Sequence, residues 1–237
     1  MVRVDDVYQK VLALANKEQR GYITPQDFNL FANQAQMEIF EQYFYDTNVA
    51  RKNQGNDTVV ADIDDMLEQK LQEFHESWLS NGSNTFPFNE AYRISGVFIG
   101  DPSNPAELRS CEILDPKDLL AAMLQSPLLA PTADLPIATI RGNAVTAFSS
   151  TSSSGNEATI IIYIRAPRRV NWTYVVINKQ AMYDANGTTQ HFEVHASEEN
   201  QLINKILMLS GLANRQPDLM KAGQGMEMVT TQKQPKI

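Results

Sequence analysis

Apolar residues in the first third of the chain recur at the three- and four-residue spacing of amphipathic helices. A first helix is expected after the acids Asp5 and Asp6, with an apolar face made by Val7, Val11, Leu14 and Ala15. A second helix is predicted to begin at Thr24, Pro25 and Asp27, which supply a capping hydroxyl, a first-turn proline and a first-turn acid. Its apolar stripe is the longest in the chain: Phe28, Phe31, Ala32, Ala35, Ile39 and Tyr43.

After a polar stretch at residues 48–58, the apolar positions are again spaced as in a helix. The acids Asp62, Asp64 and Asp65 lie near the N-terminal end of this third predicted helix, where the helix dipole favours negative charge. Its apolar residues are Ile63, Leu67, Leu71, Phe74 and Trp78. The helix is therefore expected to run through Trp78 and to end before residues 80–84.

From Phe86 the pattern changes to the short apolar runs and alternation that are typical of β-strands. Strands are predicted at residues 92–99, 107–114, 137–148, 158–165 and 172–177. A brief helix at residues 117–125 and loops at 100–105 and 149–156 separate them.

A last helix is predicted near the C-terminus. Phe192 and Val194 alternate with polar residues as in a strand, and residues 197–199 resemble a helix start. The apolar residues of this helix are Leu202, Ile203, Ile206, Leu207 and Leu209, and Gly211 is placed to end it. Beyond Leu212 the periodicity is lost, which is consistent either with an arm that orders on a neighbouring subunit or with a disordered end.

These patterns predict an α+β protein with an N-terminal helical bundle, a central and mainly antiparallel β-sheet insertion, a C-terminal closing helix and an extended arm. The expected organisation is a helical part at residues 1–85 and a β-rich part at 86–195. A closing helix at 196–213 is expected to pack on the helical part, and the arm covers 214–237.

Charge limits the possible partners. The formal net charge is −8 and the isoelectric point is about 4.9, which argues against affinity based on neutralising phosphates. The densest basic group is Arg165, Arg168 and Arg169, for which a solvated turn is predicted in preference to a nucleic-acid contact. No window of 18 consecutive apolar residues and no apolar leader is found, so neither a membrane span nor secretion is expected.

The sequence gives little support for a metal-binding site. Residues 16–28 have the glycine position of an EF-hand loop, but Arg20 occupies a position where calcium needs an oxygen ligand. His191 and His195 lie four residues apart in an expected strand, where two surface histidines are the simpler interpretation. No metal ligand is therefore predicted.

The sequence also gives little support for a catalytic or cofactor-binding site. The lone Cys111 is expected to be a small apolar residue in a strand. The sequence has no nucleophile elbow, phosphate cradle or dinucleotide-binding turn. We therefore expect no enzyme, no catalytic residue and no cofactor.

The order of these features resembles a family of virion structural proteins of tailed phages, including crAss-like and marine phages. The resemblance lies in turns, caps and core positions over most of the chain, at residues 14–29, 35–44, 70–74, 87–94, 126–132, 136–137, 141–143, 163–167, 172–174, 192–199 and 203–207. It implies a subunit of the head-to-tail connector that forms an oligomeric ring below the portal, through which DNA passes.

The resemblance also implies partners. These are the portal protein, adjacent tail or ring proteins, and further copies of the chain in a ring. The resemblance does not fix the copy number, for which we expect about twelve subunits. DNA would pass without sequence-specific binding. The expected location is the neck or upper tail of the virion, and the host cytoplasm during assembly.

Two groups of residues are predicted to make these contacts. They are Arg165, Arg168 and Arg169 in the basic group, and Pro217, Leu219, Met220, Met226 and Met228 in the arm. The alternatives are a tail-hub or tail-completion protein and, from a different class, a small soluble phage-encoded enzyme or regulatory binding protein.

Overall fold

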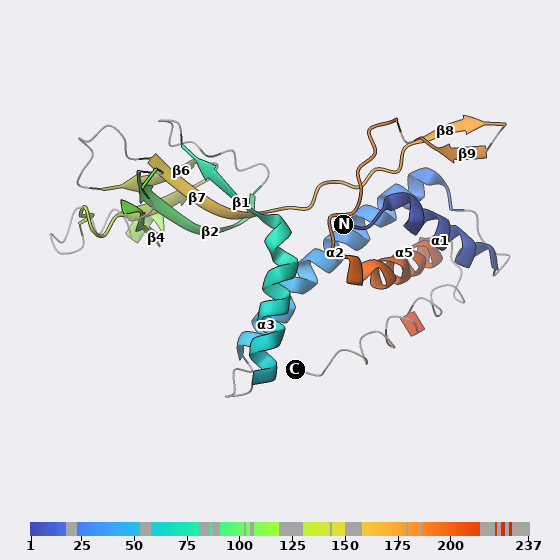
Figure 1. The fold of residues 1–237 in the computed structure, drawn as a ribbon, viewed down its shortest axis with the longest axis horizontal. Helices are drawn as coiled ribbons and strands as arrows, with labels where there is room; N and C mark the ends of the chain where they lie inside the picture. Colours follow the sequence, from blue (N-terminus) through green and yellow to red (C-terminus); the bar gives the residue numbers. More distant parts are fainter. Residues whose placement is uncertain are drawn as a thin grey trace. The chain divides into compact units, whose positions relative to one another are not determined.

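The computed structural model of the chain describes residues 1–17, 23–52, 58–80, 86, 91–101, 103–104, 107–118, 130–142, 144–149, 158–178, 180–184, 186–213, 221, 224, 225 and 228. The fold is α+β, with helices towards both ends of the chain and mainly antiparallel sheets between them, which confirms the predicted class (Figure 1).

The chain divides into two compact units. The helical unit comprises Met1–Glu73 and Pro167–Ile237, and the β unit is the single continuous stretch Phe74–Ala166. These boundaries differ from the predicted ones at residues 85 and 195. The β unit begins and ends earlier than expected, and residues 167–195 return to the helical unit before the closing helix begins.

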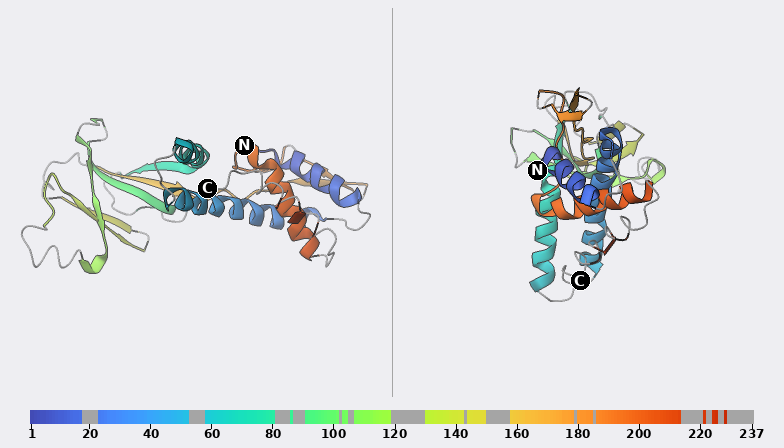
Figure 2. Two further views of the ribbon diagram at one scale, coloured as in Figure 1. Left: turned by 90° about the horizontal axis from the view of Figure 1, so that it is seen from below. Right: turned by 90° about the vertical axis from the view of Figure 1, so that its right-hand side faces the viewer.

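The helical unit is built from α1 (Val4–Lys17), α2 (Pro25–Lys52), α3 (Thr58–Leu71) and α5 (Glu199–Ala213). The closing helix α5 packs against both α1 and α2, and it crosses α2 (Figure 2). Residues of all three helices form the apolar core, including Val7, Phe28, Phe40, Leu202 and Ile206. The predicted packing of the last helix on the helical part is therefore observed.

The start of α2 follows the predicted capping pattern. The backbone N–H of Asp27 donates to Thr24 Oγ1 at 3.2 Å, and the Thr24 hydroxyl donates to Asp27 Oδ2 at 2.6 Å. The reciprocal bonds satisfy an amide that has no partner within the helix. Asp27 therefore stabilises a helix end, as predicted.

The third helix ends earlier than predicted. After α3 ends at Leu71, a short 3₁₀ turn, Gln72–Phe74, leads into strand β1 (His75–Leu79), which pairs antiparallel with β7 (Ala158–Arg165). Trp78 therefore lies on a strand opposite Ile161. The prediction failed because Phe74 and Trp78 are four residues apart, an even spacing that places side chains on one face of a strand as well as of a helix.

The β unit contains a four-stranded antiparallel sheet in the order β1-β7-β2-β3, with β2 at Ala91–Gly100 and β3 at Arg109–Ser110. A three-stranded sheet has the order β4-β5-β6, from Glu112–Leu114, Ile137–Arg141 and Ala144–Phe148, with β4 parallel to β5. Their shared core includes Val97, Ile161, Val145, Cys111 and Phe86.

Two predicted strands are divided in the structure. The predicted strand at 137–148 is the hairpin β5–β6, which turns at Gly142 with a φ of 54°, a conformation that glycine adopts without strain. The predicted strand at 107–114 is divided at Cys111 between two sheets. Of the predicted helix at 117–125, only Lys117 and Asp118 are described, and both are helical.

A small hairpin belongs to the helical unit. Its strands are β8 (Tyr174–Ile177) and β9 (Gln180–Tyr183), which pair only with each other among the described residues. Only β8 was predicted.

Candidate interaction surface

The segment that returns to the helical unit is held by side-chain amides of α2. Asn29 donates to the carbonyl of Trp172 at 3.3 Å and accepts from its N–H at 2.9 Å. One turn further along α2, Asn33 makes the same pair of bonds with Val170, at 2.9 and 2.8 Å. Each amide therefore satisfies both backbone groups of an extended residue, as a neighbouring strand would.

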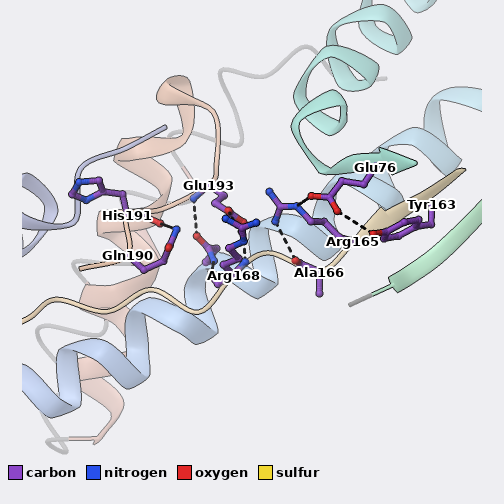
Figure 3. A network of polar contacts seen from close by, with 9 residues as sticks. Glu76, Tyr163, Arg165, Ala166, Arg168, Gln190, His191 and Glu193 are labelled. Carbon is purple, nitrogen blue, oxygen red and sulfur yellow. Dashed lines mark hydrogen bonds and ion pairs between the residues drawn. The ribbon is translucent and has the colours of Figure 1, made fainter. Parts of the chain in front are cut away.

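Gln36 is the third side-chain amide in this row, and we call Asn29, Asn33 and Gln36 the amide ladder of α2. The Gln36 side chain donates to the Arg168 carbonyl at 2.8 Å and accepts from the N–H of Glu193 at 3.0 Å. The buried Glu193 carboxylate accepts the N–H of Arg168 at 2.8 Å (Figure 3). The backbone of Arg168 is therefore fixed from two sides.

The side chains of Arg168 and Arg169 are exposed on this fixed backbone. The Arg168 side chain is 65% exposed, and its Nε lies 3.9 Å from a Glu193 carboxylate oxygen. Arg169 is also exposed. Both cations can reach solvent from a segment whose main chain is anchored to a helix.

Arg165 is in a different environment from the other two arginines. It ends β7 in the β unit and is buried, with Nε 2.8 Å from Glu76 Oε1 and its guanidinium 5.7 Å from the Phe74 ring centroid. Tyr163 donates to the other oxygen of Glu76 at 3.0 Å (Figure 3). The prediction of one loop with three solvated cations is therefore wrong for Arg165, because its charge is already used inside the β unit.

Of the five predicted contact residues of the arm, the structure describes one. Pro217, Leu219, Met220 and Met226 lie outside the described residues. Met228 is described, and its side chain is exposed.

Both neighbouring histidines accept a backbone N–H. His191 Nδ1 accepts from Val4 at the start of α1, at 3.4 Å, and His195 Nδ1 accepts from Ser197 at 3.3 Å. Each imidazole therefore accepts from an amide in the first turn of a helix. Within the described ranges, no three His, Cys, Asp or Glu side chains are grouped closely enough to hold a metal ion.

Cys111 packs in the β-unit core. Burial raises the pKa of its thiol to about 11, so the thiol stays protonated near neutral pH. Because the thiolate is the reactive form, this environment does not activate Cys111 as a nucleophile.

A buried ion pair lies between α3 and the short 3₁₀ turn, Ala196–Glu198, that precedes the closing helix α5. Lys70 Nζ is 2.5 Å from Glu198 Oε1, and both side chains are largely buried. The same ammonium lies 5.6 Å from the ring centroid of Tyr43. Burial, together with the charge of Glu198, raises the pKa of the Tyr43 hydroxyl, so it remains neutral. Glu198, predicted as a helix-start acid, therefore also links two elements of the helical unit.

The hairpin β8–β9 presents an apolar surface that was not among the predicted contact residues. Val175, Ile177 and Met182 lie on one face and are 48%, 50% and 53% exposed. On the opposite face, Tyr174 and Tyr183 stack on the buried Trp172. The available signal was the run of three apolar residues from Val175 to Ile177, and all three of them are exposed in the structure.

No helix in the described part of the chain combines the length and apolar character needed to cross a bilayer. The sequence matches no protein-family model and no curated protein.

Proposed function

We propose that this chain is a structural subunit of a tailed-phage head-to-tail connector, assembling as a ring below the portal through which DNA passes. The proposal begins from the order of turns, caps and core positions that resembles virion structural proteins. One structural observation supports it most: a continuous β-rich unit, Phe74–Ala166, is inserted into a helical unit that α5 closes. The apolar pattern of the sequence predicted this combination of a helical part and a β insertion, and it is compatible with a connector subunit.

The charge of the chain is compatible with a passage for DNA. A net charge of −8 repels a polyanion, so a channel wall with this balance would let DNA move without holding it. The exposed Arg168 and Arg169 are then suited to an acidic protein neighbour. Their anchored backbone lowers the conformational entropy that is lost when such a contact forms.

The decisive experiment is to locate the chain in purified particles. Mass spectrometry of virions is expected to detect its peptides at the level of other neck proteins. Electron microscopy of the purified protein mixed with portal is expected to show an added closed ring. Absence from virions would contradict the proposal, and density at the tail hub would favour a tail-hub role instead.

The arginine contact has its own test. The variant Arg168→Gln/Arg169→Gln is expected to weaken recruitment to the portal about fivefold at low salt and less at high salt, because exposed charge pairs are screened. Sedimentation of the mixed proteins at two salt concentrations measures this. The matched control is Arg141→Gln, an exposed arginine of the β unit. Equal recruitment of variant and control at both salt concentrations would remove the two arginines from the interface.

A further inference from the structure

The β8–β9 hairpin has two open edges. In the described part of the chain, β8 pairs only with β9, so one side of each strand has no neighbouring strand. The N–H of Asp184 donates to the Thr173 carbonyl at 3.0 Å just below the hairpin. Antiparallel pairs alternate between bonded and non-bonded positions, so the backbone groups of Tyr174 and Val176 on β8, and of Ala181 and Tyr183 on β9, point outward.

The hairpin also has an apolar face. Val175, Ile177 and Met182 lie on the face opposite the stacked tyrosines and are each about half exposed. Stacking on Trp172 anchors the hairpin through its tyrosine face, and the side chains of Val175, Ile177 and Met182 on the other face stay exposed. Exposed apolar side chains beside open strand edges are the features of a surface that pairs with another strand.

The charge of the hairpin identifies the kind of partner. From Thr173 to Tyr183, Lys179 is the only charged residue, although one fifth of the whole chain is charged and its net charge is −8. Two copies of such an acidic protein repel each other over most of their surfaces. A contact between identical copies is therefore favoured at a surface like this one, where no acid faces another acid.

The strand directions fit a second copy as well. Because β8 and β9 run in opposite directions, the outer edge of β9 is antiparallel to the outer edge of β8 in a copy placed beside it. Pairing β9 with β9 would leave β8 open in both copies. Pairing β9 with β8 repeats around a ring and leaves no open edge once the ring closes.

We propose that the β8–β9 hairpin docks on the same hairpin of a second copy of this chain, with the edge of β9 pairing antiparallel to the edge of β8. The apolar face of Val175, Ile177 and Met182 becomes part of a continuous sheet shared between copies. The closure of this sheet into a ring rests on the proposed function, whereas the contact between two copies does not.

A lipid surface is the other partner that an apolar hairpin could meet. Open strand edges are unfavourable in hydrocarbon, because no water satisfies their N–H and C=O groups. The net charge of −8 also repels anionic lipid headgroups. Both observations favour a second copy of the chain.

Two variants test the docking. Ala181→Pro removes an outward N–H without affecting the bonds within the hairpin. Val175→Thr/Ile177→Thr/Met182→Thr keeps residues that favour strands and removes most of the apolar surface on that one face of the hairpin. The matched control is Leu30→Gln/Leu135→Ser, which replaces apolar side chains that are 69% and 74% exposed elsewhere. Circular dichroism is used to check that all three variants are folded.

Native mass spectrometry of the full chain over about a hundredfold range of concentration measures association. The wild type and the control are expected to form oligomers as concentration rises, and both hairpin variants are expected to need at least about tenfold more protein. A wild type that stays monomeric throughout would overturn the proposal. So would a wild-type oligomer that neither variant weakens, or binding of monomers to phosphatidylserine vesicles through the hairpin.

A disulfide trap tests the direction of pairing. If the pairing between copies keeps the register of the hairpin, Met182 of one copy lies opposite Val175 of the next. A protein carrying Met182→Cys is mixed with one carrying Val175→Cys, and a heterodimeric disulfide is expected under mild oxidation because such cross-strand neighbours bring their Cβ atoms within about 5.5 Å. Efficient cross-linking of Met182→Cys to itself would indicate β9–β9 pairing and overturn the head-to-tail arrangement. Detection of the chain in virions tests the proposed function separately, so either idea can fail alone.

Discussion

Single charged residues show most clearly how burial changes the role of a side chain. Arg165, Glu193 and Glu198 are all buried. Each has a fixed partner within its own unit: Arg165 pairs with Glu76, Glu193 with the N–H of Arg168, and Glu198 with Lys70. Removing one partner of such a pair leaves an uncompensated buried charge, which is strongly destabilising. We therefore expect these three residues to stabilise the fold, whereas the exposed Arg168 and Arg169 are free to contact another protein.

Asp46 gives a pH-dependent prediction at the residue scale. Burial raises the pKa of its carboxyl and Glu198 raises it further, while Lys70 lowers it. A carboxyl whose pKa is higher in the folded state than in the unfolded state makes the protein less stable as pH rises through this interval. Asp46→Asn is therefore expected to raise the free energy of unfolding at pH 7, and the gain should shrink as pH falls towards the ordinary aspartate pKa of about 3.9.

Urea denaturation of wild type and Asp46→Asn at neutral and acidic pH measures this difference. Asp65→Asn, at an exposed position of α3, serves as the control and should change the stability little at either pH. A loss of stability in Asp46→Asn at pH 7 would show that the attraction to Lys70 outweighs burial.

At the scale of elements, the most informative feature is the amide ladder of α2. A helix cannot pair with an extended segment through its own backbone, because its N–H and C=O groups are already bonded along the helix axis. The side-chain amides on one face of α2 bond to the backbone of the extended segment instead; they belong to Asn29, Asn33 and Gln36. The ladder fixes the segment that carries Arg168 and Arg169 and leads to the hairpin.

Asn33→Ala tests the ladder. The change removes both bonds to Val170, which is buried, and leaves its N–H and C=O without these partners. The expected loss of stability is about 2 kcal/mol. The control is Gln34→Ala on the exposed face of the same helix, which should cost less than about 0.5 kcal/mol. Equal midpoints of urea unfolding for the two variants would show that water satisfies the backbone of Val170 as well as the Asn33 side chain does, with no loss of stability.

At the scale of the whole molecule, each unit has its own core. The β-unit core gathers Phe86, Val97, Val145 and Ile161 without a residue from the helical unit. We expect residues 74–166 to fold as an isolated fragment, because a compact unit with its own core can fold alone. Trp78, which packs on Phe86 with ring centroids 5.5 Å apart, is the only tryptophan in the fragment and reports on it.

Trp78 fluorescence of the fragment should show one cooperative unfolding transition in urea. A gradual change with no transition would mean that the β unit needs the helical unit to fold. Comparing the free energy of unfolding of the fragment with that of the β unit in the full chain then shows how much the helical unit stabilises the β unit.

Local sequence patterns determined much of this protein. The start of α2, the apolar stripe of α5 and the strand β7 were predicted because caps and periodicity act between residues that are close in the chain. The tertiary structure decided which strand pairs with which, where α3 ends, that Arg165 is buried and that the hairpin face at Val175, Ile177 and Met182 is exposed. These features depend on contacts between residues far apart in the chain, such as Trp78 with Ile161 and Asn33 with Val170, whose pairing no local pattern specifies.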